Sequence, residues 1–250
     1  MPAMRPAADL FDEQRRSPAF REIVRELWVS VQREEPDRAE RGYRIEGDVK
    51  MKIYLGIVGS KKVHAFAQDH HCGWVLTPDN HRNVPSGSYF LDNGAFSAWK
   101  NNKPYKIEPF LKLIEKYPDF DFLVVPDIVC GGMDSFRYSQ SVVHNLPQPR
   151  YLAVQDGMRI NDIFFNLENY DGIFVGGSID WKYRTAIHWA DVAHHQGLKC
   201  HVGRVGTWEG LTIMDRWGID SVDTTTPSRH QCDAHIVKYQ DQIQHQMVIV

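Results

Sequence analysis

The sequence lacks the features that mark secreted, disulfide-rich and membrane-spanning proteins. Its four cysteines, Cys72, Cys130, Cys200 and Cys232, have no paired spacing. That argues against a disulfide framework and against a Cys-x-x-Cys zinc ribbon. No apolar run approaches the roughly 20 residues that cross a bilayer, and the first residues have no apolar core of a secretory signal. We therefore expect a cytoplasmic protein without membrane contact.

An excess of basic charge is also missing. The chain has 29 Lys and Arg against 32 Asp and Glu, a formal net charge of -3 at pH 7. A nucleic-acid partner would therefore have to be held by a local basic patch rather than by the whole surface. The apolar share of 42% and the charged share of 24% are those of an ordinary globular protein, and 250 residues are enough to bury a full core.

Residues 1–50 differ from the rest of the chain and are expected to form a helical extension. They are rich in Arg and Glu, and the apolar residues at positions 20, 23, 24, 27, 28 and 31 fall on one face of a helix. This helix would begin after Ser17 and end at Pro36. We expect it to pack against the main domain; docking to a partner or to nucleic acid is the alternative. Residues 51–250 form the second predicted unit.

From residue 51 onward, short β-rich runs alternate with helical or loop segments. The eight runs cover residues 52–58, 73–76, 88–91, 122–125, 150–154, 172–175, 199–202 and 219–222. Such alternation predicts an α/β protein with a parallel sheet, and eight units predict closure into a (β/α)8 barrel, the TIM barrel. An open doubly wound sheet is the alternative, but no Gly-x-Gly-x-x-Gly follows the first run.

Three helices between the later runs have readable patterns. Two are predicted by apolar stripes, one at Ile107, Phe110, Leu111 and Ile114 and one at Leu211, Met214 and Trp217. The third is predicted over residues 185–196 and ends at Gly197, a residue type favoured just beyond a helix.

Polar and glycine-rich groups follow most of the predicted strands. In chain order they are Asp79 and Asn80, residues 92–96, Pro126 and Asp127, residues 155–157, residues 176–178, residues 203–207 and Asp223. A barrel gathers these groups at one mouth, where enzymes of this fold keep their chemistry. Taken singly, an aspartate after a strand is often a helix cap, and a Gly-Gly pair is often a turn.

A purely structural role is a weaker explanation for the set of Asp92, Asp127, Asp223 and Gln155. Carboxylates that share one mouth raise each other's pKa, which is a cost in stability that a function would explain. Such a set suits displacement at a sugar carbon, in which one carboxylate attacks and a second group moves protons. A third carboxylate beside an amide fits guanine. Its oxygens accept from N1–H and the exocyclic amine, while Gln155 and a glycine N–H face O6.

Five segments resemble, in order, the motifs of tRNA-guanine transglycosylases. Residues 91–96 (LDNGAF) resemble the Asp-Ser-Gly-Gly-Phe motif, and residues 153–157 (AVQDG) resemble the Val-Gln-Gly-Gly turn. Residues 175–178 (VGGS) are similar to Gly-Gly-Leu, and residues 201–211 to Met-Gly-Val-Gly-Thr-Pro-Glu-Asp-Leu with one insertion. Residues 223–229 match Asp-Cys-Val-x-Pro-Thr-Arg with the same step from aspartate to proline.

The resemblance implies a base-exchange reaction. Asp223 would attack C1′ of a guanosine and expel guanine, and Asp92 would be the general acid/base. A 7-deazaguanine, such as 7-cyano-7-deazaguanine, would then attack the covalent intermediate. The base-binding residues implied are Asp127, Gln155, Gly176 and Gly177, with Asn93, Phe96, Gly203 and Arg229 in the same site.

Three departures from the family bear on the nucleic-acid partner. The Cys-x-Cys-x-x-Cys zinc module of the tRNA enzymes is absent after the last strand, and the chain is shorter than a typical tRNA-modifying member. Ala95, Ser97 and Asp156 replace family residues near the site. The resemblance is therefore greatest to the transglycosylases that place 7-deazaguanines in DNA. DNA is the expected partner and tRNA the alternative; a homodimer is left open.

Two further sets of residues are candidates for binding a metal ion and phosphate groups. His230, Cys232 and His235 offer three ligands without an evident fourth, so no metal cofactor is expected and zinc is the alternative. Basic residues expected in or near the mouth-side loops could contact phosphates. They are Lys61, Lys62, Arg82, Lys100, Lys103, Arg204 and Arg229.

Two other functions compete with base exchange. One is a non-catalytic subunit that binds nucleic acid beside an active partner, although the presence of both Asp92 and Asp223 argues against it. The other is a glycoside or nucleoside hydrolase that uses the same carboxylates with water as the acceptor.

Overall fold

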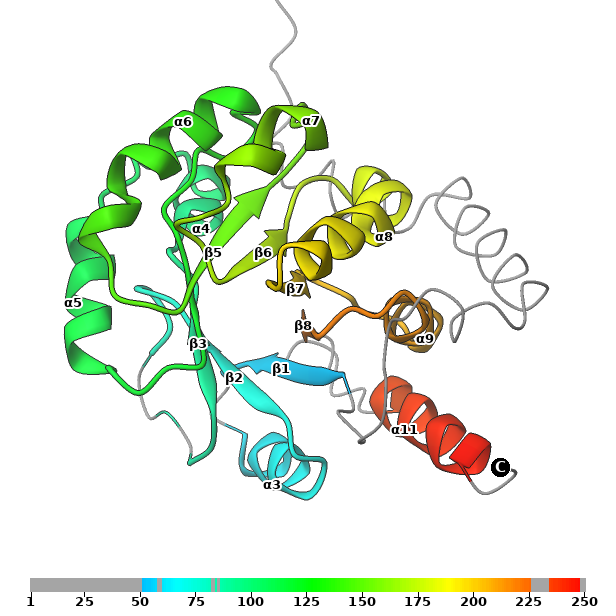
Figure 1. Ribbon diagram of the computed structural model, residues 1–250. Coiled ribbons are helices and arrows are strands. Elements are labelled where there is room, and N and C mark those ends of the chain that lie inside the picture. Colours follow the sequence, from blue (N-terminus) through cyan, green and yellow to red (C-terminus); the bar gives the residue numbers. More distant parts are fainter. Residues whose placement is uncertain (1–50, 58–59, 82–83, 85, 226–233, 248–250) are drawn as a thin grey trace, which may run out of the picture.

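A computed structural model describes residues 51–57, 60–81, 84, 86–225 and 234–247. Within them, eight strands form one closed parallel barrel in chain order, and β8 pairs with β1 to complete it (Figure 1). This confirms the predicted (β/α)8 fold. The strands are β1 (Lys52–Gly56), β2 (Gly73–Leu76), β3 (Tyr89–Leu91), β4 (Leu123–Val124), β5 (Arg150–Val154), β6 (Gly172–Val175), β7 (Lys199–Val202) and β8 (Ser221–Thr224). The helical extension predicted for residues 1–50 lies outside the described residues.

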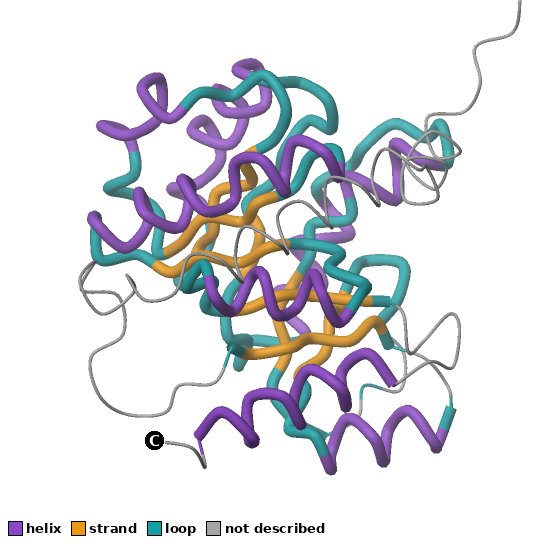
Figure 2. The backbone as a smooth tube through the Cα atoms, turned by 90° about the vertical axis from the view of Figure 1, so that its right-hand side faces the viewer, coloured by secondary structure: helices purple, strands orange, loops and turns teal. Residues whose placement is uncertain are grey.

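Helices lie around the outside of the strands, as two perpendicular views show (Figure 1 and Figure 2). They are α3 (Lys61–Asp69), α4 (Ala95–Lys100), α5 (Glu108–Lys116), α6 (Met133–Val142), α7 (Ile160–Ile163), α8 (Ile179–His195), α9 (Trp208–Arg216) and α11 (Ala234–Met247). Two short 3-10 helices are η1 (Val143–Asn145) and η2 (Phe164–Asn166). None of the helices in these described ranges is long and apolar enough to cross a bilayer.

Four strands, β2, β5, β6 and β7, have the predicted bounds, but the prediction for β8 was wrong by two residues. The run 219–222 was taken as the strand, whereas β8 is Ser221–Thr224. Ile219 is apolar because it is buried next to α9, where its N–H donates to the carbonyl of Met214. Asp223 is therefore the third residue of the strand and not the residue after it, which places its side chain deeper in the barrel.

Helices are present at all three predicted segments, with two differences in detail. Gly197 follows α8 with φ +71°, as expected of a glycine beyond a helix end, but α8 begins at Ile179, six residues earlier than predicted, with Ser178 as its cap. In α5 the buried stripe is Phe110, Leu113 and Ile114, and Leu111 is 36% exposed.

Aromatic rings fill part of the barrel interior. Tyr54, Phe90, Phe122 and Tyr151 are buried there. Phe122 stacks on Tyr151 with ring centroids 4.0 Å apart and on Phe90 at 4.6 Å. A separate and larger apolar core lies between the strands and the surrounding helices. A cavity remains toward the carboxyl ends of the strands.

Two glycines make room for the interior tyrosines. A Cβ on Gly172, the first residue of β6, would lie 2.5 Å from ring carbons of Tyr151, and a Cβ on Gly73 would lie 2.5 Å from the ring of Tyr54. Both distances are far shorter than van der Waals contact. The glycines are thus required by ring packing and not by turn geometry.

We expect Gly172→Ala to lower the free energy of unfolding by about 1–3 kcal/mol, because the added methyl group overpacks the interior. Urea denaturation of Gly172→Ala, Tyr151→Leu and the double variant measures this. The smaller side chain at 151 should accept the methyl group, so the double variant should lose less than the sum of the single losses. Strictly additive losses would contradict the packing explanation.

Candidate active site

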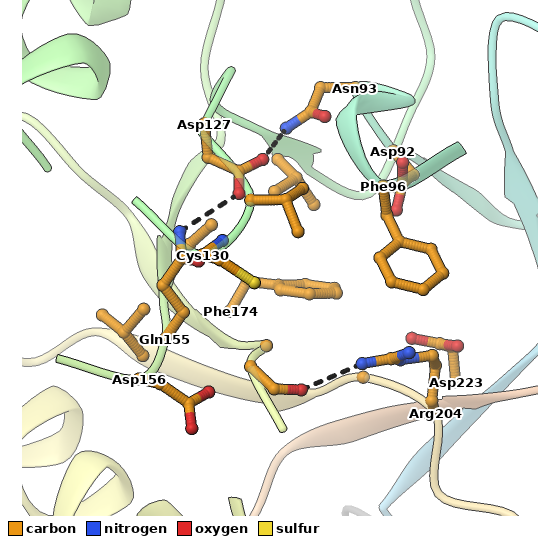
Figure 3. A pocket seen from close by; sticks show the side chains of 17 residues that line it. Asp92, Asn93, Phe96, Asp127, Cys130, Gln155, Asp156, Phe174, Arg204 and Asp223 are labelled. Atoms are coloured by element: carbon orange, nitrogen blue, oxygen red, sulfur yellow. Dashed lines mark hydrogen bonds between the residues drawn. The ribbon is translucent and has the colours of Figure 1, made fainter. Parts of the chain in front are cut away.

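A cavity opens at the carboxyl ends of the strands, and the sequence-predicted site residues surround it (Figure 3). Its volume of about 120 Å³ far exceeds the roughly 10–15 Å³ that one water needs. The predicted residues on its wall are Asp92, Asn93, Phe96, Asp127, Gln155, Gly176, Gly177, Gly203 and Asp223. Arg229, the remaining predicted site residue, lies outside the described residues.

Asp223 lies deep in the cavity with its side chain directed inward from β8. The residue is 7% exposed. Its Oδ1 lies 3.2 Å from Nε2 of His201, whose Nδ1 lies 2.9 Å from Oγ of Ser221. The backbone carbonyl of Asp223 accepts from Val205 at 2.8 Å. A Cβ on Gly203 would lie 2.8 Å from Phe174 and 3.4 Å from Oδ1 of Asp223, so a glycine at 203 keeps the approach to this carboxylate open.

Asp92 lies on the cavity wall, directly after β3. Its Oδ1 accepts from the N–H of Gly94 at 2.7 Å. The pKa of Asp92 is raised to about 6, chiefly by desolvation at the cavity wall and also by the charges of Asp223 and Asp127, against the Gly94 N–H and the Arg204 charge. A carboxyl group with this pKa exists in both protonation states near neutral pH, which suits a general acid/base.

Asp127 and Asn93 form a polar pair beside Asp92. Asn93 donates from Nδ2 to Oδ1 of Asp127 at 2.9 Å and to the carbonyl of Val125 at 3.0 Å, and its Oδ1 accepts from Ala95. Burial raises the pKa of Asp127 to about 6, partly offset by the Asn93 hydrogen bond. Asn93 therefore orients Asp127, which keeps acceptor lone pairs for a ligand in the cavity.

The side-chain amide of Gln155 is hydrogen-bonded to other residues of the protein. Its Nε2 donates to the carbonyl of Ile128 and to Oγ of Ser135, both at 2.9 Å, while its Oε1 accepts from the N–H of Cys130 at 2.6 Å. Both amide hydrogens thus have protein acceptors. Gln155 fixes the loop that follows Asp127, and a direct bond to a ligand oxygen would need a different rotamer.

Sequence reasoning missed His201 and Cys130 as residues of the site, and it named Arg204 only as a possible phosphate contact. Cys130 and Arg204 line the cavity and have φ of +61° and +60°, a region that non-glycine residues rarely adopt. Arg204 donates to the carbonyl of Gly177 at 2.9 Å, and its guanidinium lies 4.5 Å from the centroid of the Phe96 ring. It therefore joins the β6 and β7 ends of the wall to α4.

The cavity is acidic. Asp92, Asp127, Asp156 and Asp223 line it, and Arg204 is the only Lys or Arg among the described residues that do. Asp156 accepts from the N–H and from the hydroxyl of Ser178, both at 2.6 Å, so it also stabilises the start of α8. The four lysines that were predicted to contact phosphates, Lys61, Lys62, Lys100 and Lys103, are exposed outside the cavity.

The absence of a metal cofactor stays a prediction. Within the described residues, no three His, Cys, Asp or Glu side chains are grouped to hold a metal ion. Of the suspected ligands, His235 lies on α11, while residues 230 and 232 lie outside the described ranges. Zinc therefore stays an alternative on sequence grounds.

The chain matches no protein-family model and no curated protein sequence.

We expect Asp92→Asn to stabilise the protein at pH 8 by about 1–3 kcal/mol and to have little effect near pH 4. The folded-state pKa of Asp92, about 6, lies above the 3.8 of an unperturbed aspartate. The folded state therefore loses stability as pH rises from about 4 through 6, and an asparagine does not titrate. The amide can still accept from Gly94. Urea denaturation at both pH values measures the difference.

A matched control is Asp134→Asn, which alters an exposed ion pair with Arg137. It should change stability by less than about 1 kcal/mol at either pH. If Asp92→Asn changes the free energy of unfolding equally at pH 4 and pH 8, the pKa of Asp92 is not raised in the folded state.

Proposed function

We propose that this protein is a transglycosylase that exchanges guanine for a 7-deazaguanine in DNA through a covalent aspartyl-glycosyl intermediate. The observation that supports it most is the placement of two carboxyl groups from distant segments on one cavity. Asp223 lies at its base, and Asp92, with a pKa of about 6, lies on the wall. Displacement at a sugar carbon with retention needs one carboxylate to attack and a second group to transfer protons.

In the first half-reaction, a carboxylate oxygen of Asp223 attacks C1′ of the nucleoside. The C1′–N9 bond breaks, its electron pair leaves with guanine, and Asp92 donates a proton to the departing base. In the second half-reaction, N9 of the incoming 7-deazaguanine attacks C1′ and loses its proton to Asp92. The Asp223 carboxylate leaves, so both residues return to their starting states.

The base would lie between the wall residues that present acceptors and backbone donors. Asp127 offers carboxylate oxygens to N1–H and the exocyclic amine of guanine, held in place by Asn93. Gly176 and Gly177, after β6, bring backbone close to the cavity, and a Cβ on Gly177 would lie 2.5 Å from Oδ2 of Asp156. The ring of Phe96 supplies an apolar face on the cavity wall.

DNA is the proposed nucleic acid because the sequence lacks the zinc module that the tRNA enzymes carry. Transfer RNA is the alternative. Because the reacting carbon must reach Asp223, the nucleotide must leave the base stack or already be unpaired.

We expect labelled guanine to enter duplex or single-stranded DNA but not tRNA when incubated with the protein. Asp223→Asn should reduce incorporation by at least about 10³-fold, because an amide is a poor nucleophile. Asp134→Asn, on the surface, is the matched control and should exchange at the wild-type rate. Label in tRNA alone would reject the DNA version. Release of guanine without any incoming base would favour a hydrolase, and binding without exchange would favour a non-catalytic subunit.

The pH dependence of the two half-reactions should be opposite. Guanine release needs protonated Asp92, so its single-turnover rate should fall about tenfold per pH unit above the Asp92 pKa of about 6. Attack by the incoming base needs ionised Asp92, so that rate should rise up to about pH 6 and then level off. Complete exchange should be fastest near pH 6. Guanine release that rises steadily from pH 5 to 8 would show that Asp92 is not the acid.

A further inference from the structure

His201 is the buried group of the site that the proposed reaction leaves without a role. It lies on β7 in a parallel pair with Ser221 of β8, and Asp223 follows two residues later on the same inward face. The side chain is 0% exposed and stacks on Phe174 with ring centroids 4.9 Å apart. Because the ring is fully buried, its protein partners define its state.

The hydrogen bonds of His201 select one tautomer. Burial lowers the pKa of its imidazole and the charge of Lys182 lowers it further, against the effect of Asp223, so the ring is neutral at pH 7 and carries one N–H. The carboxylate of Asp223 has no proton to donate, so it accepts from the N–H at Nε2 of His201. The hydroxyl of Ser221 can donate to the unprotonated Nδ1. Hence the proton lies on Nε2, and Ser221 fixes it there.

The backbone on either side of this pair is also fixed. The ammonium of Lys182, which is 1% exposed, donates to the carbonyl of Gly203. Val205 donates to the carbonyl of Asp223 at 2.8 Å. The Lys182 bond joins α8 to the segment after β7, and the Val205 bond joins that segment to Asp223 of β8.

We propose that His201, as the Nε2–H tautomer set by Ser221, is a positioning residue that holds Oδ1 of Asp223 so that Oδ2 attacks C1′. The inference rests on the proposed function and extends it. The same N–H bond stabilises the carboxylate charge when Asp223 is expelled in the second half-reaction. Because the imidazole neither gains nor loses a proton, Asp92 remains the proton-transfer group, and the exchange stays balanced.

The test measures adduct formation and binding separately. A labelled guanine-containing oligonucleotide is mixed with each variant, and the covalent adduct is followed on denaturing gels while affinity is measured by fluorescence anisotropy. His201→Leu should slow adduct formation at least tenfold with an unchanged Kd. His201→Gln, whose Nε2 can replace the donor, should restore the rate to within about threefold of wild type. Ser221→Ala keeps the imidazole, frees its tautomer and should give an intermediate rate.

The matched control is His194→Leu. His194 also bonds an aspartate beside β8, with Nε2 2.9 Å from Oδ2 of Asp220, but Asp220 precedes the strand and lies at the other end of the barrel. This variant should form adduct at the wild-type rate. Circular dichroism and thermal denaturation verify the fold of every variant.

A second measurement does not depend on activity. Nitrogen-15 NMR of histidine-labelled protein, assigned with His201→Gln, should show the Nε2–H tautomer of His201 at pH 7.5 and a mixture in Ser221→Ala. A Nδ1–H tautomer or an imidazolium would overturn the inference. So would wild-type adduct rates in His201→Leu, or a His201→Gln variant as slow as His201→Leu. If wild-type protein forms adduct with neither DNA nor tRNA, the proposed function fails, and the spectrum alone decides whether His201 holds Asp223.

Discussion

The filling of the barrel interior by aromatic rings is the constraint on which the rest of the structure depends. Eight short parallel strands enclose a space that holds the buried rings of Tyr54, Phe90, Phe122 and Tyr151. Phe122 stacks on Tyr151 at 4.0 Å and on Phe90 at 4.6 Å between ring centroids. Such packing leaves little interior space for polar side chains, and those that β7 and β8 place there, His201, Ser221 and Asp223, are hydrogen-bonded to one another. The inward side chains that follow the aromatic layer, on β7 and β8, are His201 and Asp223, and they begin the polar site.

The position of the site above an apolar layer sets its electrostatics. Asp92 and Asp127 share one cavity with Asp223, and partial removal from water raises the pKa of each of the first two to about 6. This arrangement costs stability at neutral pH. It also keeps at least one carboxyl group close to its titration point at physiological pH, which a solvent-exposed aspartate would not achieve.

Sequence patterns predicted the fold well because buried parallel strands appear as apolar runs bounded by Gly, Pro and polar residues. The same reasoning found Asp92 and Asp127, which follow strands. It misplaced β8, since burial against α9 makes Ile219 look like a strand residue. His201 lies within β7, and the sequence of a strand does not show which of its polar residues faces a site.

Other details of the site depend on backbone geometry that residue identity does not reveal. Cys130 and Arg204 have positive φ, although nothing in a cysteine or arginine indicates this conformation. The orientation of Gln155 depends on the loop over residues 128–130, whose carbonyl and N–H groups satisfy its amide. Predicting that orientation needs the loop conformation, which follows from contacts between segments and not from local sequence.

The charge distribution limits which part of a nucleic acid could enter the cavity. Four aspartates line it and Arg204 alone among the described lining residues is basic, so a phosphate inside would be repelled. A neutral purine meets no such cost, and the raised pKa values of Asp92 and Asp127 reduce the negative charge it faces. Base binding inside with the phosphates outside requires the nucleotide to be turned out of its stack. For the proposed exchange, C1′ must also reach Asp223 at the base of the cavity, which favours a substrate whose base is already unpaired or easily extruded.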